Sequence, residues 1–501
     1  MWTLLAVALS AWAYYASIGL GEFWPAAWIA PIPVLLVAFR SSWRKAALAA
    51  FAAYFLGSLN LVGYLSMALP LALVVVFLAL PALVFAGVVL LARLAVRRLP
   101  AWAAVFAFAA GWTSYEFLFS LVSPHGTALS LAYSQTDVLP LLQIASVTGL
   151  WGVTFVVTLV PSAVAVALCA KSRRSAWALA SALAAVLVVL VCGVVRLRTA
   201  PQQSEVRVGL TATDQGIFPA FDTDNPAVAL AVAHAYANRV AHLAAQGTQV
   251  VILPEKFVGV TPADSDAIQQ VFSEAARAAH VTVIAGFNRF TLRPRRNVAM
   301  VFAPDGRAVL EYEKRHLLPG PETGYEIGAA LGLFPGPAAR PSALPSRDHE
   351  GAVQWGVAIC KDMDFPAWSR AYAQRGVRIL AVPAWDFVRD ARLHSRMAVV
   401  RGVEEGFTIA RAAQQGRLTF SDAYGRILAE APSARLPEAF LVRDIPAGPG
   451  ATVYTRFGDW FGWLCVIALA ATCARLVGRP ILAAAAFPGG WTRWKAGPRA
   501  E

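Results

Sequence analysis

The sequence predicts a multi-span α-helical membrane domain combined with an α/β domain that lies outside the membrane. Hydrophobic residues make up 58% of the 501 residues and charged residues only 15%, which is more apolar surface than water-soluble cores alone could hide. Apolar runs long enough to cross a bilayer occupy both ends of the chain. Between them, short β-branched runs alternate with Ala-rich helical stretches, and this pattern predicts the α/β domain.

Eight apolar runs can each form a membrane-crossing helix. They cover residues 2–20, 25–39, 46–67, 70–92, 101–122, 140–169, 176–195 and 459–478. Basic residues gather after the second, fourth, sixth and eighth runs, so those connections and both ends of the chain are expected in the cytoplasm. The first run lacks a cleavage pattern followed by a polar region, and we expect it to be retained.

By the same alternation, the polar stretch between the seventh and eighth runs is expected outside the cytoplasm. Arg196 and Arg198 oppose this orientation, but the basic residues that favour it are more numerous. Basic loops also account for the net charge of +13, so nucleic acid is not an expected partner. The predicted organisation is a seven-span bundle over 1–198, an extramembrane α/β domain over 204–448, an eighth transmembrane helix over 456–480 and a basic cytoplasmic tail over 481–501.

The polar stretch has the element pattern of a layered α/β domain. Strands are predicted at 206–211, 249–253, 281–287, 297–303, 354–359, 378–382, 407–411 and 417–421. Helices are predicted at 226–246, 264–279, 366–376 and 391–405, where apolar residues recur at three- and four-residue spacing. A Pro/Gly-rich stretch at 319–346 is long enough to predict a lid or a binding loop.

Cys360 is the most informative single residue. The other four of the five cysteines lie in apolar, membrane-like segments, so this thiol has no disulfide partner within its domain. It stands between a β-branched run and a charged turn, and Glu255 and Lys314 likewise follow apolar runs. Strand ends are where α/β folds present reactive groups, and three such ends predict one site.

Each of these three residues has an ordinary structural explanation when it is taken alone. Cys360 could be a small buried hydrophobe, Glu255 a capping or surface carboxylate, and Lys314 part of a solvated charge run. The combination favours catalysis, because a thiol nucleophile needs a base to take its proton or a cation to stabilise the thiolate. Glu255 can supply the base and Lys314 the cation.

Glu255, Lys314 and Cys360 resemble the Glu-Lys-Cys triad of the nitrilase superfamily, whose αββα sandwich forms thioester intermediates. A nitrilase-like domain set between seven spans and an eighth is similar to the apolipoprotein N-acyltransferase family of bacterial inner membranes. Signatures of the superfamily and of this family are matched by residues 360–366, 132–135, 140–143, 149–153 and 454–459.

This resemblance implies a ping-pong N-acyltransferase that works at the periplasmic face of the inner membrane. A phospholipid would give its sn-1 acyl chain to Cys360, and the acceptor would be the N-terminal amine of diacylglyceryl-cysteine in an apolipoprotein. Glu322 occupies the position of a second essential glutamate. We expect a monomer that uses no cofactor. We also expect no metal, because the histidines show no paired ligand spacing and no Cys-x-x-Cys occurs.

Four further residues are candidates for contact with substrate. Lys361 follows the cysteine where the family usually has Tyr, and a neighbouring ammonium would favour the thiolate. Trp385 and Phe387 lie in a segment closer to soluble amidases, and Glu116 is an acid inside an apolar span. These departures keep open a membrane-tethered amidase, or an acyltransferase for a different amine. The alternative that is not an enzyme is a membrane scaffold or a transporter with an inactive domain.

Overall fold

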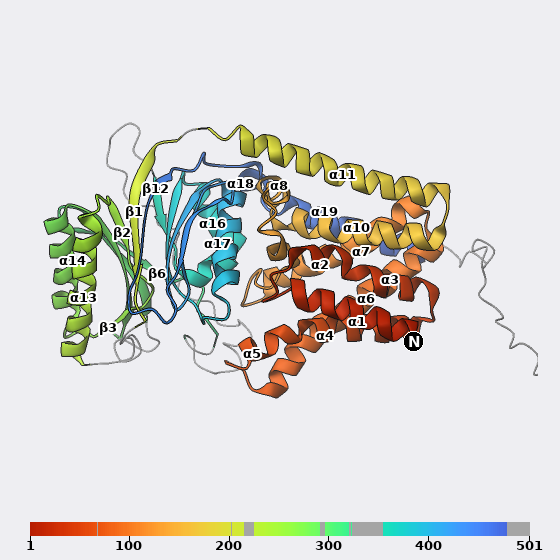
Figure 1. Cartoon of the computed structure of the whole chain (residues 1–501), viewed down its shortest axis with the longest axis horizontal. Helices are drawn as coiled ribbons and strands as arrows, with labels where there is room; N and C mark the ends of the chain where they lie inside the picture. The colour runs from red at the N-terminus through yellow and green to blue at the C-terminus, as the bar shows by residue number, and fades with distance from the viewer. Residues whose placement is uncertain are drawn as a thin grey trace, which may run out of the picture.

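The computed structural model describes residues 1–67, 69–201, 203–214, 225–290, 296–319, 322 and 354–477. It consists of a helical bundle and a layered α/β domain that lie side by side along the long axis of the molecule (Figure 1). Most of the predicted loop at 319–346, and all of the predicted tail at 481–501, lie outside the described residues.

Both ends of the chain form the helical bundle. The N-terminal part contains α1 (Trp2–Ser17), α2 (Trp24–Ile29), α3 (Pro31–Arg40), α4 (Trp43–Gly57), α5 (Val62–Leu65), α6 (Leu71–Arg98), α7 (Ala101–Val122), α8 (Leu139–Leu142), α9 (Ala145–Thr148), α10 (Leu150–Ala170) and α11 (Arg173–Arg198). The C-terminal part adds α18 (Val453–Phe457) and α19 (Trp460–Val477). In Figure 1, α19 lies beside α7 and α10, so the last helix of the described chain completes the bundle.

Among the described residues, six helices are long and apolar enough to cross a bilayer. They are Trp43–Leu65, Leu71–Arg98, Ala101–Val122, Leu150–Ala170, Arg173–Arg198 and Trp460–Val477. These coincide with six of the eight predicted spans. The first two predicted spans differ, because α1 has 16 residues and α2 with α3 forms a shorter apolar helix.

The difference is one of length, not of location. Sixteen residues at 1.5 Å each reach about 24 Å, which is less than the ~30 Å hydrocarbon core. Both α1 and α3 nevertheless pack against α4 in the same bundle. The count of eight spans therefore remains a prediction, with six supported by helix length and composition.

Small side chains allow the helices of the bundle to approach closely. Ala13 of α1, Ala38 of α3 and Ala50 of α4 are buried in one apolar core. At Gly462 of α19, a Cβ atom would stand 2.7 Å from the ring of Phe117 on α7. Substitution of this glycine would therefore separate the C-terminal helix from the rest of the bundle.

The α/β domain contains two sheets. The first has the strand order β12 (Ala439–Pro446), β1 (Glu205–Ala212), β2 (Val250–Ile252), β4 (Thr282–Arg289), β5 (Arg296–Phe302) and β6 (Ala308–Glu313), with β3 (Val258–Val260) paired to β4. The second has the order β11 (Ile427–Pro432), β10 (Arg417–Ser421), β9 (Thr408–Gln414), β8 (Ile379–Trp385) and β7 (Trp355–Val357). Strands β1, β2 and β4 run parallel, as do β7, β8 and β9.

Four layers follow from the burial pattern. The two sheets face each other across one core, to which Ile252 and Val357 both belong. Helices α13 (Pro226–Ala244) and α14 (Ser265–Ala279) cover the outer face of the first sheet, with Phe272 in their shared core. Helices α16 (Pro366–Ala373) and α17 (Ala391–Glu405) cover the second sheet (Figure 1). The predicted αββα sandwich is confirmed.

Helix α17 joins the two domains. Ala398 packs into the core under the second sheet, whereas Met397 and Val400 pack into the core of the helical bundle. Its C-terminal end adds polar contacts, since Glu404 Oε1 accepts a hydrogen bond of 2.7 Å from the backbone N–H of Leu150 at the start of α10. A helix that is buried on both faces fixes the α/β domain against the ends of the membrane helices.

Candidate active site

Glu255 lies three residues beyond the end of β2, at the edge where the two sheets meet. Its backbone N–H donates to the carbonyl of Ala384 in β8, at 3.3 Å, and its carbonyl accepts from Gln414 Nε2 of β9, at 3.1 Å. These bonds tie the turn after a strand of one sheet to two strands of the other. At Gly286 of β4, a Cβ atom would stand 2.3 Å from the Pro254 carbonyl oxygen, so this close approach requires glycine.

Lys314 follows β6 directly, and the residue is 2% exposed. Its Nζ donates to Glu255 Oε1 at 2.8 Å and to Glu322 Oε2 at 2.9 Å. A buried ammonium is stable only when its charge is paired. The two glutamates supply this pairing and fix the ammonium at the edge of the sandwich.

The carboxylate of Glu322 accepts more hydrogen bonds than the carboxylate of Glu255 does. Besides Lys314, its carboxylate accepts from Lys256 Nζ at 2.5 Å, from Asn297 Nδ2 at 2.8 Å and from the backbone N–H of Leu318 at 2.7 Å. Burial alone would raise the pKa of Glu322, but Lys256 and Lys314 outweigh it and hold the pKa well below its usual range. This carboxylate therefore stays ionised.

Glu255 differs from Glu322 in how its two oxygens are used. Its Oε1 accepts from Lys314 and, at 2.6 Å, from Asn297 Nδ2. Its Oε2 is buried and accepts no hydrogen bond from any residue that the structure describes. An unfilled, buried carboxylate oxygen next to a fixed ammonium is the arrangement that a general base needs.

Cys360 lies at the start of a short 3-10 turn, Cys360–Asp364, just past β7. Its φ of 42° lies in the left-handed region, which is uncommon for a residue with a side chain. The thiol is half-buried, and Sγ lies 3.5 Å from the carbonyl oxygen of Trp385 at the end of β8. Such strained positions at strand ends often carry reactive groups.

Glu255 and Lys314 both influence the ionisation of the Cys360 thiol. Burial raises the pKa of Cys360 well above its usual value, and the carboxylate of Glu255 raises it further. Lys314 acts in the opposite direction and favours the thiolate. Burial by itself lowers the pKa of Lys314, but Glu255 and Glu322 outweigh it, so that pKa is raised and the ammonium is retained. The resting cysteine is consequently a neutral thiol beside an ionised lysine.

Two residues of this cluster were not predicted from the sequence. Asn297, the second residue of β5, donates hydrogen bonds to both Glu255 and Glu322. Lys256 forms an ion pair with Glu322. Lys256 directly follows the predicted base, which was an available signal. Asn297 had none, because an Asn at a strand start is ordinary and its role depends on the pairing of β5 with its neighbours.

Lys361 does not face the thiol partners. Its Nζ lies 3.0 Å from Asp364 Oδ2 and 3.2 Å from Nδ1 of His125, which belongs to the loop after α7. In the same loop a Cβ on Gly126 would stand 2.4 Å from the Asp364 carbonyl oxygen. The ammonium thus connects the turn that carries the cysteine to the membrane domain, and the predicted role in ionising the sulfur has no support in these contacts.

The other candidates divide into residues beside the site and a residue remote from it. Trp385 flanks the thiol through its carbonyl, and Lys256 Nζ stands 5.7 Å from the centroid of its ring. Phe387 faces Tyr64 of α5, with 6.5 Å between ring centroids. Glu116 lies in α7 of the bundle and not at the site.

Four donors surround the carboxylate of Glu116. They are Trp112 Nε1 at 3.1 Å, Ser130 Oγ at 2.6 Å, the backbone N–H of Leu131 at 2.9 Å and Thr154 Oγ1 at 2.8 Å. Both oxygens are filled, so the contacts describe a structural carboxylate that joins α7 to α10 and to the turn at Leu131–Gln135.

Asp386, Asp390 and His394 form the group among the described residues that could hold a metal ion. Arg411 reaches both carboxylate oxygens of Asp386. A cation bound there would meet the guanidinium, so the residues do not fit a metal well. Arg411 lowers the pKa of Cys360 in opposition to burial, whereas Asp386 raises it, so this cluster lies within electrostatic reach of the thiol.

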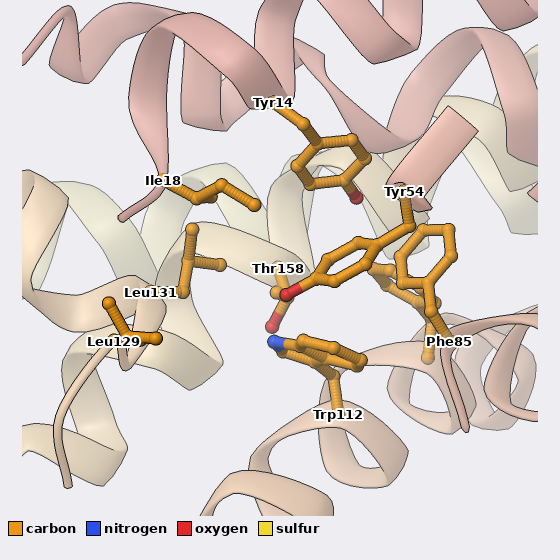
Figure 2. Close-up of a pocket in the computed structure, with 9 residues that line it drawn as sticks. Tyr14, Ile18, Tyr54, Phe85, Trp112, Leu129, Leu131 and Thr158 are labelled. Atoms are coloured by element: carbon orange, nitrogen blue, oxygen red, sulfur yellow. The ribbon is translucent and has the colours of Figure 1, made fainter. Parts of the chain in front are cut away.

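A small hollow inside the bundle is separate from this site. It is lined mainly by rings and aliphatic side chains from α1, α4, α6, α7 and α10, including Tyr14, Tyr54 and Trp112. Figure 2 shows the Tyr54 and Thr158 oxygens and the Trp112 ring nitrogen turned toward one another across it. None of the three converging residues lines it, and we assign it no role in the chemistry.

The sequence matches two family models. Residues 8–163 match the family described as "Apolipoprotein N-acyltransferase N-terminal domain", and residues 217–445 match "Carbon-nitrogen hydrolase". The second match supports an enzyme of the carbon-nitrogen hydrolase class, the nitrilase superfamily.

Similar proteins extend this assignment along the chain. An apolipoprotein N-acyltransferase of Geobacter metallireducens is 27% identical over 90% of both chains, and one of Bradyrhizobium diazoefficiens is 26% identical over 71% of this chain and 70% of its own. A solved amidase from Nesterenkonia sp. shares 22% identity, with a TM-score of 0.39, over 50% of this chain and 93% of its own. These matches support an apolipoprotein N-acyltransferase-like protein of the nitrilase superfamily, of the acyltransferase class, in a bacterial membrane.

Proposed function

We propose that this protein transfers an acyl chain from a phospholipid to the N-terminal amine of diacylglyceryl-cysteine in apolipoproteins, through a thioester on Cys360. One observation carries the proposal. Glu255 has a buried oxygen without a donor among the described residues, while its other oxygen is held by Lys314. The protein thus holds a base ready for one proton beside the thiol that must lose it.

In the first half-reaction, Glu255 Oε2 takes the thiol proton as Sγ attacks the sn-1 ester carbonyl. Removal of the proton during attack suits a thiol whose pKa is raised by burial, because little thiolate exists beforehand. The Lys314 ammonium and backbone N–H groups near residue 361 stabilise the oxyanion, and one such donor typically contributes about 3 kcal/mol. Collapse expels the lysophospholipid alkoxide, which takes the proton back from Glu255.

In the second half-reaction, the lipoprotein amine attacks the thioester and the thiolate leaves. Glu255 accepts the amine proton and returns it to sulfur, which completes a ping-pong cycle. Glu322 is a poor alternative base because four donors already fill its oxygens. Its proposed role is to hold Lys314 in place.

The same proposal includes the setting of the reaction. The catalytic domain faces the periplasm and the helices cross the inner membrane, as the distribution of basic loops predicts. In this proposal the enzyme acts as a monomer, and the residues of its triad all come from one chain. Donor lipid reaches the site at the junction between the α/β domain and the bundle.

The test is to incubate the purified protein with phospholipid labelled in its sn-1 chain and to measure a hydroxylamine-sensitive adduct. Wild type should become labelled, whereas Cys360→Ser should form no hydroxylamine-sensitive adduct. Absence of label on folded wild-type protein would rule out the donor half-reaction. Mass spectrometry of lipoprotein N-termini after depletion separates this function from a tethered amidase, since only loss of the acyltransferase leaves diacylated forms.

A further inference from the structure

Lys256 places a second ammonium at the active site, and neither half-reaction described above uses it. Its Nζ donates to Glu322 Oε1 at 2.5 Å and lies 3.9 Å from Glu255 Oε1. The Lys256 side chain is only 12% exposed. A cation with so little access to water is stable when carboxylates pair with it. The positive charge of Lys256 is therefore a fixed part of the site.

The backbone at Lys256 explains how two successive residues can join one cluster. In an extended strand, the side chains of Glu255 and Lys256 would point to opposite sides. Lys256 instead has a φ of 48°, in the left-handed region. With this turn, Glu255 contacts Lys314 while Lys256 contacts Glu322, and Lys314 and Glu322 contact each other. The local backbone thus brings the second ammonium to the same cluster as the proposed base.

Trp385 connects the position of Lys256 to that of the thiol. The centroid of its ring lies 5.7 Å from Lys256 Nζ, within the range of a cation–π contact. The carbonyl oxygen of the same residue lies 3.5 Å from Cys360 Sγ. The ring is also held by a hydrogen bond of 3.1 Å from its Nε1 to Gln415. Lys256 therefore stands against a residue that borders the nucleophile.

The charges around the thiol balance only when Lys256 is counted. Two carboxylates and two ammonium groups form the cluster, namely Glu255, Glu322, Lys256 and Lys314. The charged groups next to it in the described part of the chain are paired among themselves: Arg411 and His394 with Asp386 and Asp390, and Lys361 with Asp364. Without Lys256, the cluster would carry one excess negative charge.

This balance matters because the acceptor in the second half-reaction is a group that titrates. An α-amine has a pKa of ~7.7–8.0, so both of its forms exist near neutral pH. When a neutral amine attacks, the C–N bond forms, the C–S bond breaks, and one proton passes through Glu255 to sulfur. An ammonium brings one proton more. In this cluster, Oε2 of Glu255 is the buried carboxylate oxygen without a donor among the described residues, so the site can accept only one proton.

We propose that Lys256 selects the uncharged form of the acceptor amine, because its ammonium opposes a second positive charge at the thioester. A neighbouring cation lowers the pKa of an amine, so the bound acceptor loses its proton at a lower pH. Without Lys256, the excess negative charge would hold the acceptor as an ammonium that cannot attack. The inference rests on the proposed function and deepens it, since Lys256 acts in the second half-reaction and Glu255 acts in both.

The test measures aminolysis of the isolated acyl-enzyme by a peptide that carries an N-terminal diacylglyceryl-cysteine, between about pH 6 and 10. The rate at saturating acceptor reports the pKa of the bound amine. We expect Lys256→Gln to raise this apparent pKa by about 1 unit, which slows aminolysis about tenfold at pH ~6 and less than about twofold above pH ~9. Lys256→Met, a second neutral variant, should show the same shift. Lys256→Arg keeps the cation and should keep the wild-type profile.

The dependence on acceptor concentration gives a second signature. At limiting acceptor, the rate reports the free amine and not the bound one. Lys256→Gln should therefore lower the rate at saturation and the half-saturating concentration together, and leave their ratio nearly unchanged. A general loss of structure would lower the ratio as well.

Two controls separate the charge of Lys256 from its packing. Lys361→Met removes a buried ammonium that is paired with Asp364 beside the nucleophile, and it should leave the apparent pKa of aminolysis unchanged. Hydroxylamine is uncharged in the upper part of this pH range, so it should cleave the thioester equally fast in wild type and in Lys256→Gln there. The pH dependence of thioester formation should also be the same in both.

Three results would each overturn the inference. They are an unshifted aminolysis profile in Lys256→Gln, an equal slowing of the reaction with hydroxylamine, and a shift of the same size in thioester formation. The last result would mean that Lys256 acts on Glu255 and not on the acceptor. Failure of the wild-type acyl-enzyme to react with the peptide at any pH would instead contradict the proposed function itself, so the two failures are distinguishable.

Discussion

Two buried carboxylates, Glu255 in the α/β domain and Glu116 in the helical bundle, show how the same group can be reactive or structural. Four donors fill both oxygens of Glu116. Glu255 has donors on Oε1, but its buried Oε2 has none among the described residues. Burial is therefore common to both, and the unfilled oxygen is what distinguishes the base.

The largest effect is expected at Glu255. Glu255→Gln keeps the size and the contacts to Lys314 and Asn297 but removes the group that can take a proton. We expect thioester formation to slow by about 10³-fold, within the range of ~10²–10⁴ for general base catalysis. Rapid-quench measurement of the labelled adduct gives the rate. A loss of less than about tenfold in a folded variant would mean that another group accepts the thiol proton.

Removal of the ammonium should have the next largest effect. Lys314→Met takes away an oxyanion donor and leaves Glu255 and Glu322 as neighbouring carboxylates. We expect a fall of about 10²–10³-fold in thioester formation together with a lower Tm. Lys256→Met is the matched control, because it also removes an ammonium from Glu322 and should slow the step much less. Equal losses in the two variants would assign the effect to charge balance alone.

The sequence predicted a large part of the fold because its periodicity is strong. All eight predicted strands and all four predicted helices of the α/β domain are present, with their ends shifted by a few residues. Strands β3, β6, β11 and β12 were not among the predicted ranges. β3 is three residues long, and β6, β11 and β12 are partly exposed strands with charged residues, so the apolar pattern is weak.

The site was only partly predictable. The convergence of Glu255, Lys314 and Cys360 followed from their places after apolar runs. The position of Lys361 did not, because a residue next to a nucleophile can point either way, and here Asp364 and His125 draw it to the membrane domain. The contacts of Glu116 likewise depend on residues 14 to 38 positions away, which no local pattern reveals.

The acidic residues around His394 should make the stability of the α/β domain depend on pH. Burial alone lowers the pKa of His394, but Asp390 and Asp386 outweigh it and raise the pKa to about 9. Because this exceeds the unfolded value of ~6.5, the imidazolium stabilises the fold fully below pH ~6.5, and that contribution is lost as pH rises through about 9. The Tm of wild type should fall over this range, and that of His394→Gln should fall less. Parallel curves would contradict this assignment.

Glu116 should respond to substitution in the opposite way to Glu255. Glu116→Gln can keep Oε1 as acceptor for Trp112 and Leu131 while its amide donates to the hydroxyls of Ser130 and Thr154. We expect thioester formation within about twofold of wild type and a Tm within a few degrees. Glu116→Ala leaves four donors unpaired and should cost about 2–4 kcal/mol of stability. A large loss of activity in Glu116→Gln would make this carboxylate part of the chemistry.

Substitution of Lys361 should have the smallest effect on the reactivity of the Cys360 thiol. Lys361→Met breaks the contacts with Asp364 and His125 and should lower the Tm. The rate at which iodoacetamide alkylates Cys360 should change by less than about twofold at each pH between 7 and 9. Lys314→Met should slow the same alkylation, because Lys314 lowers the pKa of the thiol. A slower reaction in Lys361→Met alone would restore the role that the sequence suggested for this ammonium.

The most direct test is peptide mass spectrometry of the acyl group on Cys360 after brief exposure to labelled phospholipid, in wild type, Glu255→Gln and Glu116→Gln. The account predicts the acylated peptide in wild type and in Glu116→Gln, and its absence in Glu255→Gln. An acylated Cys360 peptide in Glu255→Gln at the level of wild type would contradict it.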